Sequence, residues 1–273
     1  MRYIDIHTHV NLAAFKDDYD AVIHRALDAG VWMINVGTEL STSKRAVELL
    51  GEYPEGVYAT VGLHPNHAGP SYHDTEESDT ENGGERFDYE AYKQLASHPK
   101  VVAIGECGLD YFRTTDATLL AKQKDIFAMH IALANELQKP LMLHLRSGEG
   151  GNAYKDAQEI LKNHAKVCGN SHFFAGSRED AKGFWDMGYS TSFTGVLTFA
   201  RTYDEIVKTA PANLIHAETD APYVAPVPHR GERNEPLYVI EVVKRIAELR
   251  GATEEDQAAQ LIQNAREMFN IAA

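Results

Sequence analysis

The regular alternation of short apolar runs with amphipathic segments constrains this chain most. Eight runs rich in β-branched and other apolar residues are separated by segments whose apolar residues recur at helical spacing. We expect strands at residues 3–6, 31–36, 57–63, 101–104, 140–143, 166–171, 189–193 and 214–217. Helices are predicted at 17–29, 41–52, 88–97, 116–138, 153–163, 178–187 and 203–209, with two more at 236–250 and 254–269 closing the chain.

Strict alternation of strand and helix with short connections is typical of a parallel sheet. Eight such units in 273 residues favour an α/β fold of the closed (β/α)8 TIM barrel type, for which about 250 residues are usual. A doubly wound open sheet is the alternative, but no Gly-x-Gly-x-x-Gly motif follows an early strand. Because no repeat or linker divides the sequence, residues 1–273 are predicted to form one hydrolase-type barrel domain.

Residues 69–86 interrupt the regular pattern. This segment, GPSYHDTEESDTENGGER, is acidic, rich in Ser, Thr and Gly, and almost free of aliphatic side chains. Such a composition predicts a long mobile loop. Because the loop leaves the end of the third predicted strand, it would rise over the carboxyl-end face of the barrel as a lid or partner site. A tolerated insertion is the interpretation we favour.

Charge and composition limit the classes of partner. The net charge of −14 argues against broad attraction to a polyanion, so any nucleic-acid activity must depend on a local site. No apolar stretch approaches the roughly 18 residues of a membrane span, and no signal segment is visible, so we expect a cytoplasmic protein without a membrane partner. Cys107 and Cys168 are too few for a disulfide framework and are expected to be buried free thiols.

Imidazole and carboxylate side chains recur at the carboxyl ends of the predicted strands. His7 and His9 are separated by one residue, the strand repeat, so they would project to the same side of the chain. Five further side chains follow later strands: His64, Glu106, His144, His172 and Asp220. In a barrel these strand ends meet at one rim, where enzymes of this fold keep their active sites. The pattern therefore predicts one site at the rim.

The chemistry of this set suits divalent metals. Imidazole favours zinc and other softer ions, whereas carboxylates favour magnesium and manganese. Two ions about 3.5–4 Å apart would activate a bridging water and bind both the attacking and the leaving oxygen of a displacement. A displacement by water is a hydrolysis. Glu106 is the natural bridge because a carboxylate has two oxygens, and Asp220 could accept a proton from the water. His64 could contact the substrate or donate a proton.

Several motifs together resemble the TatD family of metal-dependent deoxyribonucleases, within the amidohydrolase-like barrels. They are IDIHTHVN at 4–11, VGLHP at 61–65, AIGECGLDYFR at 103–113, LMLHLRS at 141–147, SHFFAGS at 171–177 and HAETDAPYVAPVPHRGERNEP at 216–236. The resemblance implies that His7, His9, Glu106 and Asp220 hold one metal and Glu106, His144 and His172 a second. It also implies a 3′-5′ exonuclease-like phosphodiesterase that acts on DNA.

Other residues near the motifs suggest how a substrate is held. Arg230 lies in the Pro-rich loop after Asp220, and its planar fork of donors suits a phosphate; Arg113 and Arg146 are further candidates. Glu218 is expected to support a metal ligand from behind. The acidic 69–86 segment would discourage a long duplex and leaves single-stranded DNA or 3′ ends as substrates.

Two alternatives remain open from the sequence. The first is a hydrolase on the same barrel that opens an amide, lactone or aminoacyl ester, a neutral substrate that would not need the arginines. The second is a metal-binding scaffold without turnover, whose sign would be a lost ligand or base, and none is lost. No recognition helix or basic stripe is visible, so sequence-specific DNA recognition is not expected, and no obligatory protein partner is evident.

Overall fold

The strands of this chain pair in sequence order. The computed structural model describes residues 1–69, 76–77 and 84–272, which form one parallel sheet ordered from β1 to β8. Its strands are β1 (Tyr3–Thr8), β2 (Val31–Val36), β3 (Val57–Val61), β4 (Val101–Asp110), β5 (Leu141–Arg146), β6 (Gly169–Ser171), β7 (Ser190–Phe193) and β8 (Ile215–Ala217). After β8 the chain returns to β1, where the Asp220 N–H donates to the His7 carbonyl at 2.9 Å. This contact between the two sheet edges agrees with the predicted (β/α)8 barrel, which is confirmed.

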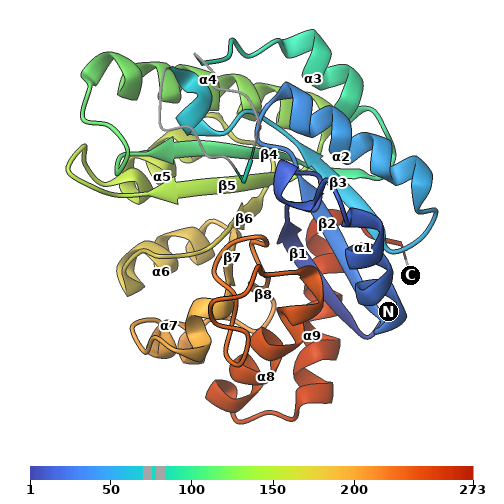
Figure 1. Ribbon diagram of the computed structural model, residues 1–273. Helices are drawn as coiled ribbons and strands as arrows, with labels where there is room; N and C mark the ends of the chain where they lie inside the picture. The colour runs from blue at the N-terminus through green and yellow to red at the C-terminus, as the bar shows by residue number, and fades with distance from the viewer. Residues whose placement is uncertain (70–75, 78–83, 273) are drawn as a thin grey trace.

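Helices surround the sheet on its outer side (Figure 1). They are α1 (Tyr19–Asp28), α2 (Leu40–Glu52), α3 (Tyr89–Ala96), α4 (Ala117–Leu137), α5 (Ala153–His164), α6 (Arg178–Asp186), α7 (Asp204–Thr209), α8 (Val239–Arg250) and α9 (Glu254–Phe269). The described residues also form the short 3-10 turns η1 (Ala13–Phe15), η2 (Pro65–Ala68), η3 (Gly195–Thr198) and η4 (Pro236–Tyr238). Local sequence sets the helix starts: Asp116 accepts two backbone N–H groups at the start of α4, and Ser177 and Asp180 form a capping box at α6.

Strand β4 runs much further than the predicted 101–104. Its ladder with β5 shifts register between Ile104 and Cys107 and then continues as far as the pair Asp110 and Arg146. The register shift is a local irregularity of the kind that re-aims a side chain beside a site. Glu106 therefore lies inside its strand, at the irregularity, rather than just after the strand as predicted.

Strands β1 and β5 are also longer than their apolar runs. β1 continues to Thr8 and β5 to Arg146, so His7 and His144 are strand residues rather than residues of the following loops. The reason is that polar side chains line the carboxyl end of the barrel, where the apolar pattern stops but the backbone ladder does not. His7 and His144 still lie at the predicted rim.

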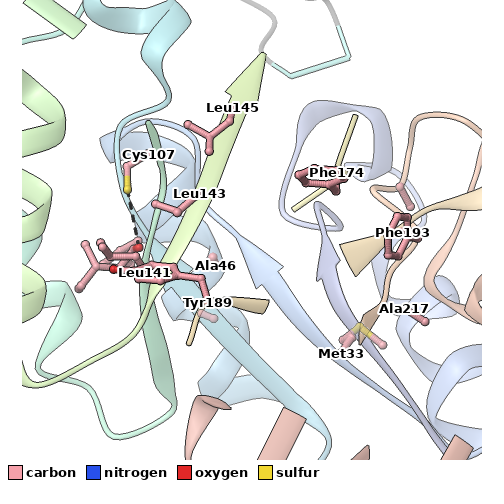
Figure 2. Close-up of a cluster of buried hydrophobic side chains, with 14 of the residues drawn as sticks. Met33, Ala46, Cys107, Leu141, Leu143, Leu145, Phe174, Tyr189, Phe193 and Ala217 are labelled. Carbon is pink, nitrogen blue, oxygen red and sulfur yellow. Dashed lines mark hydrogen bonds between the residues drawn. The ribbon is translucent and has the colours of Figure 1, made fainter. Parts of the chain in front are cut away.

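The main hydrophobic core lies between the strands and the helices. Figure 2 shows Leu141, Leu143 and Leu145 along β5, with Cys107 of β4 beside them, and all four are buried. Because side chains alternate across a strand, His144 projects to the opposite side, into the barrel. Packing of Leu141, Leu143 and Leu145 against the helices thus fixes the direction in which the His144 side chain points.

A second apolar cluster lies toward the other end of the barrel. Ile4 and Ile34 pack there with Phe269 and Ile271 from the C-terminal part of the chain. This packing places the last turn of α9 and the residues after it at the end of the barrel that lies opposite the predicted site, and leaves the carboxyl ends of the strands as the open face.

The two cysteines differ in exposure. Cys107 is a buried free thiol, as predicted, whereas Cys168 is exposed, which corrects the prediction for it. The predicted strand at 166–171 begins only at Gly169, so Cys168 lies in the connection before it. Within the described residues, none of the helices combines the length and apolarity needed to span a membrane.

Only part of the acidic 69–86 segment can be described. The predicted mobile loop lies mainly at 70–75 and 78–83, outside the described residues. Glu76 and Glu77 contact the start of η1, where their carbonyls accept the N–H groups of Ala14 at 2.9 Å and Ala13 at 3.3 Å. The Glu77 side chain also accepts from His67 Nε2 at 2.7 Å.

Candidate active site

The buried carboxylate of Glu106 stands between two groups of imidazole rings. Its Oε2 lies 3.5 Å from His7 Nε2 and 3.7 Å from His9 Nε2. Its Oε1 lies 2.8 Å from both His144 Nδ1 and His172 Nε2. Each carboxylate oxygen thus faces its own pair of ring nitrogens, as a bridging ligand requires.

Asp220 completes the first group. Its Oδ1 lies 3.2 Å from His9 Nε2 and 3.6 Å from His7 Nε2, and these two ring nitrogens are 3.0 Å apart. The other ring nitrogen of His9, Nδ1, lies 2.9 Å from the Val36 carbonyl. Since a carbonyl only accepts, Nδ1 carries the proton and Nε2 presents a lone pair to the centre. This assembly of acceptors fits a cation.

His144 and His172 form the second group, with His144 Nδ1 3.3 Å from His172 Nε2. His64 approaches the same side, its Nε2 3.4 Å from Glu106 Oε1. However, His64 Nδ1 accepts the Asn66 N–H at 3.1 Å, so in its neutral form the proton is on Nε2 and points toward Glu106. His64 therefore differs from His9, because its neutral ring offers a proton to the centre rather than a lone pair.

Burial and the neighbouring ionisable groups together set the charges of this cluster. Burial and the neighbouring His172 lower the pKa of His7 to about 3. Burial and His144 lower the pKa of His64 to about 3 as well. Burial alone would raise the pKa of Glu106, but the adjacent imidazoles, above all His172, hold it well below its ordinary value. Burial also opposes a charge on His9, His144 and His172, but the carboxylates beside them, Asp220, Asp110 and Glu106, outweigh it and raise the pKa of each ring above its ordinary value. Metal ligation needs neutral imidazoles around an ionised carboxylate, so a bound cation would displace the protons of these three rings.

Within the part of the chain that the structure describes, ligand atoms within 4.8 Å of one another occur in three overlapping groups: His7, His9 and Glu106; His7, His172 and Asp220; and His64, Glu106 and His144. All six predicted ligands, His7, His9, Glu106, His144, His172 and Asp220, thus meet in one cluster, in which only His144 is half-buried and the others are buried. Nitrogen and carboxylate oxygen donors in this number are able to bind divalent metal.

Comparison with known proteins identifies the family. A family model described as TatD related DNase matches residues 4–270. The chain belongs to the TatD family. It is 38% identical over 272 residues to YabD of Bacillus subtilis strain 168, an uncharacterised metal-dependent hydrolase, with 98% of each chain covered. It is 34% identical over 276 residues to the 3′-5′ ssDNA/RNA exonuclease TatD of Pantoea vagans, which covers 98% of this chain and 99% of that protein.

A solved structure supports the same assignment. The crystal structure of YJJV, a TatD homologue from Escherichia coli K12, matches with a TM-score of 0.83 at 28% identity and covers 99% of each chain. The family resemblance expected from the motifs is therefore confirmed. This member of the TatD family is a metal-dependent hydrolase on a TIM barrel.

Glu218 lies behind His172 in this TatD family hydrolase. Its Oε1 lies 3.6 Å from His172 Nδ1 and accepts the Phe173 N–H at 2.5 Å, while Oε2 accepts from Ser192 Oγ at 2.6 Å. These contacts fit the supporting role predicted for Glu218, which stays a prediction.

Sequence reasoning missed Asp5. This buried carboxylate accepts the Thr219 N–H at 3.0 Å and the His7 N–H at 3.2 Å. It therefore ties the strand that carries His7 to the segment that carries Asp220. Its one signal in the sequence is its place two residues before the His-x-His motif, on the same side of the strand.

Asp110 was missed as well. Its Oδ2 lies 3.3 Å from His144 Nε2, and its Oδ1 accepts the N–H groups of Phe112 at 2.9 Å and Arg113 at 3.0 Å. Burial raises the pKa of Asp110, but the hydrogen bond and charge of His144 outweigh it and hold that pKa below its ordinary value. The signal was the position of Asp110 within GECGLDYFR, four residues after Glu106, where strand alternation returns the side chain to the same side.

The three predicted phosphate-binding arginines lie at the rim, against aromatic rings. Arg146 Cζ is 3.9 Å from the centroid of the Phe112 ring, and Arg113 Cζ is 6.0 Å from it. Arg230 Cζ lies 4.1 Å from the centroid of the Phe199 ring. All three arginines are exposed, and their role toward phosphate stays a prediction.

Proposed function

We propose that this hydrolase is a 3′-5′ exonuclease that cleaves phosphodiester bonds of single-stranded DNA with two divalent ions. The observation that carries the proposal is the division of the Glu106 carboxylate, whose two oxygens face separate pairs of ring nitrogens. Relatives named 3′-5′ ssDNA/RNA exonuclease TatD support the choice of substrate. These include the Pantoea vagans protein and that of Pantoea ananatis, 33% identical over 275 residues.

Each residue of the cluster has a place in this proposal. His7, His9 and Asp220 would hold one ion and His144 and His172 the other, with Glu106 shared. Magnesium, manganese and zinc all suit these donors. When bound, two divalent ions neutralise phosphate charge and lower the pKa of water.

The proton transfers would be carried by side chains on either side of Glu106. Asp220 has a backbone φ of 55°, and its N–H is held by the His7 carbonyl at 2.9 Å, so its carboxylate is fixed at the centre. We assign Asp220 as the base that takes a proton from the attacking water. As the water oxygen bonds to phosphorus, the bond from phosphorus to the 3′ oxygen breaks. The Nε2–H of His64 would donate its proton to that leaving oxygen.

The test is release of nucleotides from a 3′-labelled single-stranded DNA. Metal-stripped protein is assayed alone and with Mg²⁺, Mn²⁺ or Zn²⁺ restored, beside Glu106→Gln, which keeps the shape of the side chain but loses the charge. We expect release only with metal, its abolition in Glu106→Gln, and normal release by Glu159→Gln, a change at an exposed helix position.

Arg230→Ala separates the proposal from the neutral-substrate alternative. A phosphodiesterase that uses Arg230 to hold phosphate should turn over DNA more slowly when this side chain is removed. Wild-type protein that binds metal but leaves DNA intact under every condition would overturn the proposal and direct the search to esters and amides.

A further inference from the structure

Two phenylalanines are unusually exposed for their size. Phe112 is 56% exposed and Phe199 is 42% exposed, and among the described residues only Met129 and Val227 are comparable large apolar side chains. Each phenylalanine ring is paired with one arginine, Phe112 with Arg146 at 3.9 Å and Phe199 with Arg230 at 4.1 Å. An exposed aromatic ring with a guanidinium beside it is an arrangement that suits recognition better than stability.

Phe112 is anchored directly to the candidate centre. Its N–H donates to Asp110 Oδ1 at 2.9 Å, and the other oxygen of Asp110 lies 3.3 Å from His144 Nε2. Arg146 is on the same strand as His144, two residues further on, and its backbone lies opposite that of Asp110 in the β4–β5 ladder. One carboxylate thus fixes both the histidine ligand and the backbone that carries the exposed ring.

Phe199 has a corresponding position after β7. It follows η3, whose residue Thr198 accepts the Val227 N–H through Oγ1 at 2.8 Å. Arg230 comes from the same loop after β8, and its Nη1 donates to the Ala225 carbonyl at 2.9 Å. These two bonds hold the loop and its guanidinium against the ring.

The order of the strands places the two pairs on either side of the second ligand group. Phe112 follows β4 and Phe199 follows β7, while β5 carries His144 and β6 leads directly into His172. A polymer whose scissile phosphate lies at these histidines would therefore pass one aromatic pair on each side.

We propose that the pairs Phe112 with Arg146 and Phe199 with Arg230 are stacking sites for two bases of a single-stranded nucleic acid, with each guanidinium binding an adjoining phosphate. The inference deepens the proposed function and rests on it. Stacking is sequence-tolerant, because every base has a π-face. It also suits a chain of net charge −14, which gains little from general attraction to a polyanion.

The experiment compares two ligands of equal length and charge. Fluorescence anisotropy measures binding of the full chain, in EDTA to prevent cleavage, to labelled oligothymidylate and to an abasic strand with the same number of phosphates. We expect wild type to prefer the strand with bases. Phe112→Ala and Phe199→Ala should each reduce that preference by about fivefold or more, the usual effect of losing one stacked base.

Matched variants separate stacking from a general defect. Phe112→Trp and Phe199→Trp keep a stacking face and should retain the preference. Met129→Ala removes an equally exposed apolar side chain from α4 and should leave the preference at its wild-type value. Equal wild-type affinity for the two strands, or an unchanged preference in both Ala variants, would overturn the proposal.

Hydrolysis of methyl p-nitrophenyl phosphate by metal-loaded wild type tests the proposed function separately, because this diester has no base. If it is not hydrolysed and DNA remains intact, the phosphodiesterase proposal fails. The binding preference then decides the stacking sites on its own.

Discussion

Oδ2 of Asp110 lies 3.3 Å from Nε2 of His144, on the side of the ring opposite the Glu106 carboxylate. Because an ionised carboxylate only accepts, the imidazole donates its Nε2–H to Asp110 and turns the lone pair of Nδ1 toward the centre. The Val36 carbonyl does the same for His9 from the other side of the cluster. Orientation of the ligands thus depends on residues that do not themselves reach the centre.

Replacing Asp110 with Asn should weaken metal binding without unfolding the protein. Because the Phe112 and Arg113 N–H groups retain the amide oxygen, the NH2 group of the new side chain would face His144 Nε2 and could not accept its proton. Loss of such a partner commonly costs about 10- to 100-fold in metal affinity. Isothermal titration of metal-stripped protein with Zn²⁺ or Mn²⁺ measures the change. Asp125→Asn, on an exposed face of α4, is the matched control. Equal affinities for Asp110→Asn and wild type would show that His144 is oriented without Asp110.

Asp110 illustrates which parts of the site the sequence alone does not predict. That His7, His9, His64, His144, His172, Glu106 and Asp220 share one rim was predictable, because it follows from the order of the apolar runs and the rule that parallel strand ends meet at one rim, although β1, β4 and β5 extend past those runs. Asp110 was not, because β4 extends past its apolar run through pairing with β5, a non-local interaction. The protonated nitrogen of His64 likewise depends on the Asn66 N–H, a detail of the η2 turn that residue spacing does not encode.

Gly62→Ala should disturb the sheet beside Glu106. A Cβ at this position would lie 2.6 Å from the Gly105 carbonyl carbon and 2.9 Å from the Glu106 nitrogen, and both are backbone atoms that cannot rotate away. We expect a loss of about 1–3 kcal/mol in the free energy of unfolding, as for other overpacked sites, together with weaker metal binding. Chemical denaturation measures the first effect and metal titration the second.

The control for this change is Gly51→Ala, in α2, where an added Cβ meets no atom within 4 Å. Alanine is the better helix former, so that variant should be neutral or more stable by up to about 1 kcal/mol. A Gly62→Ala protein as stable as Gly51→Ala would mean that β3 and β4 are further apart at Glu106 than described.

The two thiols should react at very different rates in the native protein. Cys107 is fully buried among leucines of β5, and burial raises the pKa of its thiol well above the ordinary value. Cys168 is exposed. Ellman's reagent should therefore modify about one thiol under native conditions and both in denaturant. Cys168→Ser should remove the native reaction, and a persistent fast phase in that variant would contradict the packing of Cys107 shown in Figure 2.

The contact between His67 and Glu77 should respond to pH. His67 Nε2 donates to Glu77 Oε1 at 2.7 Å, and the Glu77 backbone accepts the Ala13 N–H at 3.3 Å. Burial opposes the charge on His67, but the Glu77 hydrogen bond and charge outweigh it and raise the pKa of His67 above its ordinary 6.5. Burial likewise opposes the charge on Glu77, but His67 lowers the pKa of Glu77 below its ordinary 4.5.

These shifts define the pH range in which the pair stabilises the contact. The stabilisation from the raised pKa of His67 is complete below pH 6.5 and is lost as the pH rises through that raised pKa. The stabilisation from the lowered pKa of Glu77 is complete above pH 4.5 and is lost as the pH falls through that lowered pKa. Hydrogen exchange at Ala13 and Ala14 should therefore be slower in wild type than in His67→Gln near pH 6, by about 1 kcal/mol of opening free energy. That difference should shrink with rising pH.

His24→Gln, which removes an exposed partner of Asp20, should match wild type throughout. A difference between wild type and His67→Gln that stays constant up to pH 9 would show that His67 acts on this contact without its charge.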